Sequence, residues 1–448
     1  MPDENDGQSR AIFRHRVREP NRQGPNATFI TKNKNLSDMN RRSFLRSTLA
    51  LPLAAAGAGC TSAFDPETSS TPAIGDRDVT PYTDGTEAWP GYGFDPGNTW
   101  HNPDVTLLGE SPSTRRITSS GSRLGTTPGS AIAVAGNRLY FGTVDGQIVS
   151  YATTGERLWT DSTRRRTGVH TTPSLTKDVL FVTTGTETTA LSATGGSRLW
   201  TSDAFVRSGT SVLADDRLYA TTDDALVAAL EVETGDTAWT ITDEELRGDD
   251  EEREDSTPVV GAMGVTEDTV YTTGSWDREG HVMAIADGEK RWWREGFNPV
   301  TRPPAIAEDV IVVTTGSTVY GLDRDDGDTV WEHSLPAEWS VARGVTPAIA
   351  HGHIYVGGPK TTCLDLETGE TRWHVETGRC RNPPVAVEDG LYVGTLEGLF
   401  ALEPDGTLRW HDEAIRTERP MTAVGDRLYA VVSAGPLGTD DVYELADR

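Results

Sequence analysis

Residues 346–373 read TPAIAHGHIYVGGPKTTCLDLETGETRW, and residues 384–410 read PVAVEDGLYVGTLEGLFALEPDGTLRW. Both stretches place apolar runs, glycine turns and a closing tryptophan in the same order. Similar segments close with a tryptophan along most of the chain, at successive spacings of 41, 39, 53, 39, 42 and 37 residues. A repeat of this length indicates stacked, similar structural units. The closing positions are Trp159, Trp200, Trp239, Trp292 (or its neighbour Trp293), Trp331, Trp373 and Trp410.

Each repeat is expected to form four short β-strands. Short apolar runs rich in Val, Ile, Leu and Tyr are bounded by Gly, Asp and Asn turns, and no run has the periodicity of a helix. Turns such as Asp145-Gly146 and Thr154-Gly155 contain the glycine that a tight hairpin needs for positive φ. One meander of this size cannot bury both of its faces, so meanders must pack side by side around an axis. The pattern therefore predicts an all-β fold, a β-propeller of four-stranded antiparallel blades.

The last repeat lacks a fourth strand of its own. It ends at residues 442–445 with no tryptophan strand after it, which would leave a sheet edge open to pairing with other chains. Residues 115–118 (RRIT), ahead of the first repeat, have the shape of residues 157–160 (RLWT). We therefore expect an eight-bladed ring whose last blade is closed by this N-terminal strand. The eight second strands of the repeats are expected at residues 139–141, 180–182, 218–220, 270–272, 311–313, 354–356, 391–393 and 428–430.

The recurring Ala-x-Asp-x-x-Thr-Gly-x-x-x-Trp cadence resembles the repeat of the pyrroloquinoline-quinone (PQQ) type propellers. The opening Trp89-Pro90, followed by Asp95-Pro-Gly-Asn-Thr and Asn102-Pro103, is similar to the lead-in of that family. The resemblance runs from Trp89 to the C-terminus and implies the fold. It implies several functions, because members of the family include quinoprotein dehydrogenases, the non-catalytic assembly factor BamB, and sensor or scaffold domains.

The N-terminal part has the pattern of an exported lipoprotein. Arg41 and Arg42 precede an apolar run and then Cys60, which resembles a twin-arginine signal that ends in a lipidation site. The apolar run of about ten residues is shorter than the roughly 20 that a membrane span needs. If Cys60 is not modified, the alternatives are an uncleaved signal anchor or simple secretion. We expect residues 1–38 to be a disordered extension or a mis-assigned start, 39–60 the signal, 61–87 a flexible acidic tether, and 88–448 the propeller.

The chain is strongly acidic. Its formal net charge is −27, from 41 Lys and Arg against 68 Asp and Glu, and it becomes −32 without residues 1–59. Such a charge keeps a protein soluble but destabilises it by self-repulsion, a balance that suits concentrated salt. We interpret the composition as that of a surface protein of a halophilic archaeon. Nucleic acid is excluded as a partner, because phosphate binding needs a basic face.

Signatures of catalysis are missing. The sequence contains no Gly-x-Ser-x-Gly, His-Glu-x-x-His or Cys-x-x-Cys motif. A quinoprotein dehydrogenase would need a flat cofactor on an aromatic floor, a calcium held by carboxylates and a carboxylate base. Eight plain blades leave no long insertions to build such a site, so no cofactor and no metal are expected, with PQQ and calcium as the alternative. Cys363 replaces a small core residue and Cys380 lies in a loop; a disulfide between them is permitted but not required.

Candidate binding residues gather on one face, formed by the loops between second and third strands and by the connections between blades. An enlarged loop in blade four, residues 274–281, follows an acidic run at residues 249–255. Its tryptophan is either a recognition point or a locally packed ring. Basic residues also stand just before several innermost strands, where they can receive a carboxylate, a phosphate or an acidic peptide, or tie adjacent blades together. The candidates are His170, Arg207, Trp276, Arg302, Arg343, Arg381 and Arg419.

These observations favour a non-catalytic, exported propeller, anchored to the cell membrane by lipid and facing outside. We expect it to be monomeric and to bind a protein partner or ligand through its loop-rich face. The resemblance keeps a PQQ-dependent oxidoreductase as the first alternative. A carbohydrate or polyanion receptor is the second. BamB acts at an outer membrane, which an archaeal envelope lacks, so its task is not transferred with the architecture.

Overall fold

The computed structural model describes residues 74–119, 124, 131–164, 167–169, 171–205, 211–220, 226–242, 244–245, 259–276, 279–300, 302–336, 345–433 and 439–448. For residues 259–262 and for Trp276 it describes the backbone but not the side chain. The predicted signal residues Arg41, Arg42 and Cys60 lie outside the described residues. Among the described residues, no helix has the length and apolarity required to cross a membrane.

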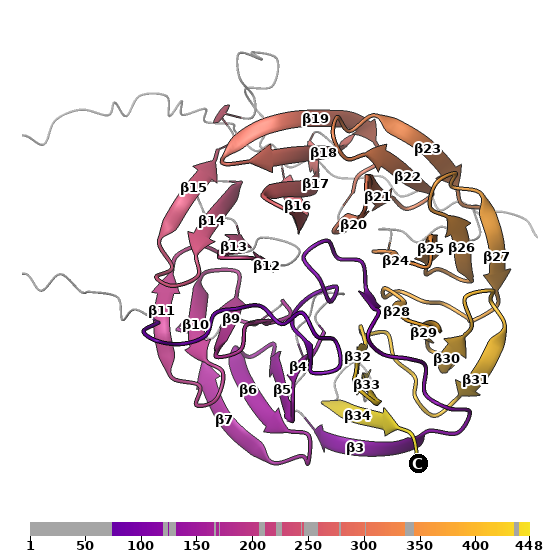
Figure 1. Ribbon diagram of the computed structural model, residues 1–448, viewed down its shortest axis with the longest axis horizontal. Coiled ribbons are helices and arrows are strands. Elements are labelled where there is room, and N and C mark those ends of the chain that lie inside the picture. The colour runs from indigo at the N-terminus through magenta and orange to yellow at the C-terminus, as the bar shows by residue number, and fades with distance from the viewer. Residues whose placement is uncertain are drawn as a thin grey trace, which may run out of the picture. The chain divides into compact units, whose positions relative to one another are not determined.

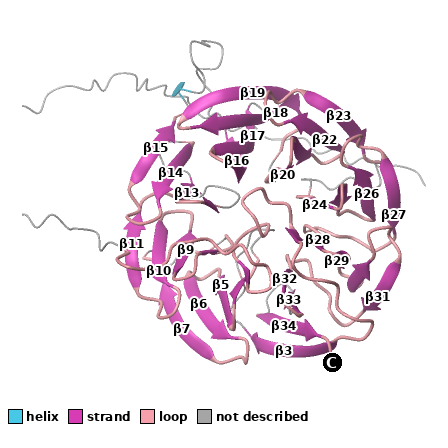
Figure 2. Ribbon diagram, viewed as in Figure 1, coloured by secondary structure: helices cyan, strands magenta, loops and turns pink. Residues whose placement is uncertain are grey.

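Eight small antiparallel sheets form a ring, and strands joined by loops make up almost all of it (Figures 1 and 2). The predicted eight-bladed propeller is therefore confirmed. In each blade the chain runs from the innermost strand outwards, because short hairpins join consecutive strands.

The strands of the first four blades, from the axis outwards, are as follows. Blade one has β4 (Ala133–Ala135), β5 (Arg138–Gly142), β6 (Gln147–Ala152) and β7 (Arg157–Ser162). Blade two has β8 (Ser174–Leu175), β9 (Val179–Thr183), β10 (Thr188–Ser192) and β11 (Arg198–Ser202). Blade three has β12 (Val212–Ala214), β13 (Arg217–Ala220), β14 (Val227–Glu231) and β15 (Thr237–Ile241). Blade four has β16 (Val259–Thr266), β17 (Thr269–Trp276), β18 (Glu279–Ala286) and β19 (Glu289–Phe297).

The other four blades follow in the same order. Blade five has β20 (Ala305–Ala307), β21 (Val310–Thr314), β22 (Thr318–Asp323) and β23 (Thr329–Ser334). Blade six has β24 (Ala348–Ala350), β25 (His353–Val356), β26 (Thr361–Asp365) and β27 (Thr371–Val375). Blade seven has β28 (Val385–Val387), β29 (Gly390–Gly394), β30 (Leu399–Leu402) and β31 (Leu408–Asp412). Blade eight has β32 (Thr422–Val424), β33 (Arg427–Ser433), β34 (Asp440–Ala446) and β3 (Ser113–Ser119), while β1 (Ala88–Trp89) and β2 (His101–Asn102) add to blades one and seven.

The repeated tryptophan joins each blade to the next. The Trp373 indole donates a hydrogen bond from Nε1 to the Pro404 carbonyl of the following blade, at 2.9 Å. Its ring also lies against Gly406, whose φ is +87° and where a Cβ atom would stand 2.8 Å from Trp373 Cδ2. Glycine is thus required twice at this turn, by the backbone conformation and by the neighbouring ring. The same indole-to-carbonyl bond is made by Trp159, Trp200, Trp292, Trp331 and Trp410.

The N-terminal strand closes the ring, as predicted. β3 pairs antiparallel with β34 through six residue pairs. The register differs from the one expected from the sequence, which matched Ile117 to Trp159. In blade one, three residues lie side by side across the second, third and fourth strands: Tyr140, Ser150 and Trp159. The equivalent row of blade eight is Tyr429, Glu444 and Arg115, so Arg115 takes the place of the tryptophan. Its guanidinium donates to the Thr153 carbonyl of the next blade at 3.1 Å, as an indole does elsewhere.

The two described cysteines are buried and free. Cys363 lies between Tyr355 and Trp373 in the row of blade six, at the small-residue position that the sequence indicated. Cys380 has no exposed surface. Burial raises the pKa of each thiol to about 12, so both are poor nucleophiles at neutral pH. The disulfide that the sequence permitted is not formed.

Candidate functional site

The predicted ring of basic residues is described only in part. His170, Arg207 and Arg343 lie outside the described residues, and Trp276 is the last residue of β17. Arg381 forms an ion pair with Glu418 of the next connection, with 3.3 Å between Nε and Oε1. These two residues thus tie adjacent connections together.

The guanidinium of Arg419 is largely buried at the seam of the ring. Its Nη2 lies 3.6 Å from Asp440 Oδ2 and donates to the Leu124 carbonyl at 3.3 Å. Asp440 in turn accepts from the Leu124 amide at 2.8 Å. Arg302 contributes through its backbone, since its carbonyl accepts a hydrogen bond from Thr273 Oγ1 at 2.7 Å. Binding of an acidic ligand by this set stays a prediction.

The enlarged loop of blade four is an extension of two strands rather than an irregular loop. β17 and β18 each have eight residues, whereas β21 and β22 of the next blade have five and six. Pairing continues from Thr269 and Ala286 out to Trp276 and Glu279. The first residue pairs of the two hairpins, Thr269 with Ala286 and Val310 with Asp323, are equivalent. The additional residues therefore lie at the other end of the blade-four hairpin, on the loop-rich face.

On the opposite face, residues 81–105 cross the centre of the ring, and we call this segment the plug. Figure 1 shows it as the indigo chain that runs over the axis in front of the innermost strands. Its carbonyl groups accept hydrogen bonds from the inner strands of blades far apart in the sequence. The amides that donate to the plug at 2.7–2.8 Å are those of Gly136, Leu175, Val265, Ile306, Ile349, Ala386 and Glu388.

Two asparagines explain why the lead-in has its particular sequence. Asn98 and Asn102 have no exposed surface. Asn98 Nδ2 donates to the Met263 carbonyl at 2.8 Å, and Asn102 Nδ2 donates to the Ala423 carbonyl at 2.8 Å. Each side chain therefore satisfies a backbone acceptor of an inner strand that the plug backbone does not reach. Trp89 and Trp100 of the same segment are also fully buried, and their ring centroids lie 5.8 Å apart.

A tight turn in the plug holds a carboxyl group with a perturbed pKa. Burial raises the pKa of Asp95 to about 6, although hydrogen bonds from the Thr99 hydroxyl and backbone amides oppose the shift.

The residues that precede the plug in the chain also pack on the blades. The Ile74 amide donates to the Glu233 carbonyl at 3.3 Å, and Pro81 bridges to Thr176. Residues 74–87 belong to the stretch that the sequence assigned to the tether.

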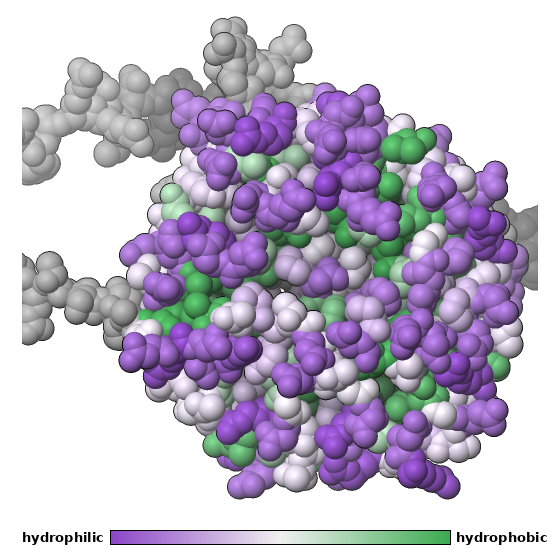
Figure 3. All heavy atoms as spheres, viewed as in Figure 1, coloured by the Kyte–Doolittle hydropathy of each residue, from purple (hydrophilic) through white to green (hydrophobic). Residues whose placement is uncertain are grey.

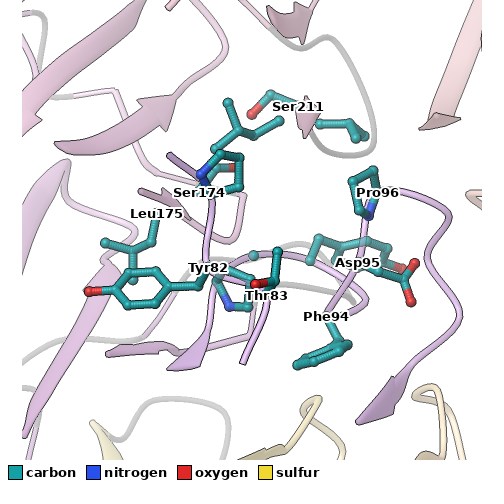
Figure 4. A pocket seen from close by; sticks show the side chains of 14 residues that line it. Tyr82, Thr83, Phe94, Asp95, Pro96, Ser174, Leu175 and Ser211 are labelled. Atoms are coloured by element: carbon teal, nitrogen blue, oxygen red, sulfur yellow. The ribbon is translucent and has the colours of Figure 1, made fainter. Parts of the chain in front are cut away.

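A pocket of about 270 Å³ lies between the plug and the inner strands of blades two and three. Figure 4 shows Leu175 and Tyr82 on one side of it, Pro96 on the other, and Ser211 at its edge. Its walls are mostly apolar, and the described residues that line it include Asp95 but no lysine or arginine. In the space-filling view, apolar side chains come to the surface over this part of the ring, within a largely hydrophilic face (Figure 3). Sequence reasoning missed this site; the density of Pro, Tyr and Phe at residues 81–96 was its signal.

Among the described residues, no group of three or more His, Cys, Asp or Glu side chains could hold a metal ion. Trp89 and Trp100 of the plug are fully buried.

Comparison with known proteins agrees with the fold. The family model described as outer membrane protein assembly factor BamB matches residues 144–263, 250–357 and 315–442. Among solved structures, quinohemoprotein alcohol dehydrogenase from Comamonas testosteroni has a TM-score of 0.66 at 14% identity, over 81% of this chain and 81% of that chain. BamB from Moraxella catarrhalis has a TM-score of 0.52 at 16% identity, over 75% of this chain and 98% of that chain. No curated protein matches the chain. At these identities the structural likeness shows the fold alone.

Proposed function

The chain belongs to the family of propellers described as outer membrane protein assembly factor BamB, and from this premise we propose that it is a non-catalytic scaffold that binds a protein partner. The observation that carries the proposal is the plug. It crosses the ring on one face, accepts hydrogen bonds from the inner strands of several blades and carries the buried side chains of Trp89, Trp100, Asn98 and Asn102. BamB-type propellers bind proteins, which supports a protein partner in general.

The extended hairpin of blade four is the proposed contact element. Its strands pair over eight positions, against five in the hairpin of blade five, and interface contacts concentrate where a rigid element carries an aromatic anchor. Trp276 is that anchor in our proposal. A second candidate contact is an acidic-ligand site at the channel mouth, formed by His170, Arg207, Arg302, Arg343, Arg381 and Arg419. Ligand binding there requires Arg381 and Arg419 to give up their ion pairs with Glu418 and Asp440.

The setting of this activity is part of the same proposal. Twin-arginine export, a lipid at Cys60 and a halophilic surface rest on Arg41, Arg42, Cys60 and the charge of −27. Under this proposal the propeller is held outside the cell by a lipid, and its partner is another envelope protein.

A cofactor experiment separates the scaffold from an oxidoreductase. The purified full-length protein is titrated with PQQ and calcium in molar salt, and absorbance, melting temperature and alcohol-dependent dye reduction are recorded. We expect none of the three to change. A rise in melting temperature with alcohol-dependent turnover would replace the scaffold with a quinoprotein dehydrogenase.

A partner experiment tests the proposed contact. The tagged protein is cross-linked in native membranes, and its cross-linked partners are compared with those of Trp276→Ser and of the triple variant with Arg302, Arg381 and Arg419 replaced by Gln. We expect the Trp276 variant to lose a defined partner, and Leu396→Ser, at an exposed residue, to keep it. Equal profiles for Trp276→Ser and wild type would contradict the hairpin. Loss in the arginine variant, with unchanged melting, would place the contact at the channel mouth.

A further inference from the structure

The pocket lies where the contacts between the plug and the ring have a gap. Five inner strands use the same residue of the repeat to donate to plug carbonyls, namely Leu175, Val265, Ile306, Ile349 and Ala386. In blade three the equivalent residue is Leu213, because Leu213 faces Leu218 as Leu175 faces Leu180. Among the described residues, the Leu213 amide donates no backbone hydrogen bond to the plug, and Leu213 lines the pocket.

The geometry of an antiparallel pair determines where the Leu213 amide points. Opposed residues alternate between pairs that exchange hydrogen bonds and pairs whose amides point away from the partner strand. Leu175, Ile306 and the other equivalents are of the second kind, since their amides reach the plug. The Leu213 amide is therefore directed to the axis. β12 thus presents an open strand edge to the pocket.

A second polar group in the pocket has an unmet hydrogen bond. Ser211 is only 2% exposed, and its Oγ has no hydrogen-bond partner among the described residues. A buried hydroxyl without a partner costs free energy and is uncommon in folded proteins. Ser211 and Leu213 both line the pocket, two residues apart in the chain.

We propose that this gap is a docking site for an extended, uncharged, apolar peptide segment of a partner protein, which pairs with the edge of β12. We infer a peptide as the occupant because the plug is itself an extended peptide and already accepts hydrogen bonds from the equivalent strand edges of other blades. Addition of a strand to an open edge takes affinity from the backbone and specificity from alternate side chains. The apolar walls, which include Pro81, Pro90 and Pro96, accept such side chains.

The same features exclude other occupants of the pocket. Among the described residues that line it none is basic and Asp95 is acidic, so an acidic segment would lose its hydration without a partner. The volume of about 270 Å³ is below the range of about 300–1,000 Å³ for sites that enclose a small ligand. A peptide needs to place only a few residues inside. This site is on the face opposite to the loop-rich face and is independent of the proposed contact at Trp276.

Amide exchange tests the open edge directly. Hydrogen exchange of the full-length protein is measured by NMR in molar salt, and the Leu213 amide is compared with the amides of Leu175, Ile306 and Ile349. We expect Leu213 to exchange at least 100-fold faster, because it lacks the carbonyl that protects the others. Equal protection would mean that another part of this chain occupies the gap, and it would overturn the proposal.

Peptide binding tests the occupant. The probe is the capped pentapeptide Val-Pro-Val-Thr-Val, and its matched control is Val-Pro-Asp-Asp-Val. We expect the first to bind and to slow exchange at Leu213 at least tenfold, and the second to bind at least tenfold more weakly. Ser211→Leu, which fills the pocket, should weaken binding at least tenfold, whereas Ser162→Leu, at an exposed residue of another blade, should not.

Leu213→Pro provides an independent variant. It removes the one amide that the peptide requires and leaves the β12–β13 ladder intact, because that amide takes no part in the ladder. Wild-type melting with lost binding would support the proposal. Absence of binding to the wild type, or equal binding by Ser211→Leu and by folded Leu213→Pro, would overturn it. The proposal would also be overturned if cyclohexanol displaced the bound peptide and the Leu213 amide still exchanged fast in the peptide complex. These two results would identify a pocket for small apolar molecules instead.

Discussion

Arg115 Nη2 lies 2.7 Å from Glu444 Oε1 at the seam where the two ends of the domain meet. The Glu444 side chain is 8% exposed and that of Arg115 is 51% exposed. Tyr429 donates to the other carboxylate oxygen at 3.2 Å. In blade seven the corresponding row is Tyr392, Ala401 and Trp410. A charged pair therefore replaces aromatic packing at the closure of the ring.

Removal of the arginine at this seam is expected to destabilise the ring. Arg115→Ala leaves the buried Glu444 carboxylate with Arg427 alone, whose Nη1 lies 3.7 Å from Oε2. Because Arg115 is half exposed, we expect a loss of about 2 kcal/mol in the free energy of unfolding, between the values for exposed and buried pairs. The control is Arg116→Ala in the same strand, whose exposed ion pair with Asp441 at 3.4 Å is worth less than about 1 kcal/mol. The double variant Arg115→Trp, Glu444→Ala restores the row of the other blades and should equal or exceed the wild type. Denaturant unfolding in molar salt measures all three, and equal losses for the two alanine variants would contradict this account of the seam.

Two glycines separate backbone strain from contact between blades. Gly352 has φ +70° and open space around its Cα, so Gly352→Ala should cost about 1–2 kcal/mol from the left-handed conformation alone. Gly406 has φ +87° and also meets the Trp373 ring, so Gly406→Ala should cost about 1–3 kcal/mol more. Thermal and denaturant unfolding of the pair give the difference. If both alanine variants lose the same amount, the tryptophan is not packed between blades as described.

The pKa of His101 predicts a dependence of stability on pH. Burial lowers this pKa to about 4 from its usual value near 6.5, and the neighbouring His351 adds to the shift. Between these values the unfolded chain binds a proton that the folded chain does not, so this contribution to stability is complete above pH 6.5 and is lost as the pH falls towards 4. His101 is partly accessible, so the loss should be of the order of 2 kcal/mol rather than the full value of the shift. His101→Phe should reduce the fall in unfolding free energy between pH 7 and pH 4.5, and an unchanged fall would assign it to other groups.

Salt should stabilise the fold. With −32 on the chain from residue 60 onward, a reduction of ionic strength from 1 M to 0.1 M lengthens the screening distance from about 3 Å to about 10 Å and increases repulsion. The unfolding free energy should therefore fall as potassium chloride is removed. Equal stability in 0.1 M and molar salt would exclude the halophilic interpretation.

Export is tested at the two motifs of the signal. The variant Arg41→Lys, Arg42→Lys should leave precursor inside the cell, because a twin-arginine translocase reads the pair itself. Cys60→Ser should release the protein into the medium or leave an unprocessed band, visible by mass at the mature N-terminus. Normal secretion of the first variant, or an unchanged N-terminal mass in the second, would contradict the corresponding motif.

The eight blades could be predicted because each repeats a local pattern. Apolar runs, turn glycines and a tryptophan such as Trp373 specify hairpins within about 40 residues of sequence. The register of β3 could not be predicted, because Arg115 replaces the tryptophan that marks the row and a bulge follows it. The likeness of residues 115–118 to residues 157–160 aligns Ile117 with Trp159, whereas the structure places Arg115 opposite Glu444 in that row.

The plug and its pocket were beyond the reach of sequence patterns for a different reason. The segment has no periodicity, and its partners are distant in the chain: Asn98 bonds to Met263, and Asn102 bonds to Ala423. The pocket exists because the plug does not contact Leu213, which no local signal encodes. The lead-in was recognised as a family feature, but its position across the axis follows only from the assembled ring.

The plug also determines the order in which this protein can be completed. Residues 81–119 leave the ribosome before any blade, yet β3 finds its partner in β34, at the end of the chain. Until then, these early residues expose Trp89, Trp100 and an unpaired strand, all of which favour aggregation. Their contacts span up to 338 residues, and such long-range pairings form slowly. A cell that makes this protein must keep the first part of the domain from wrong partners until the last strand has been synthesised.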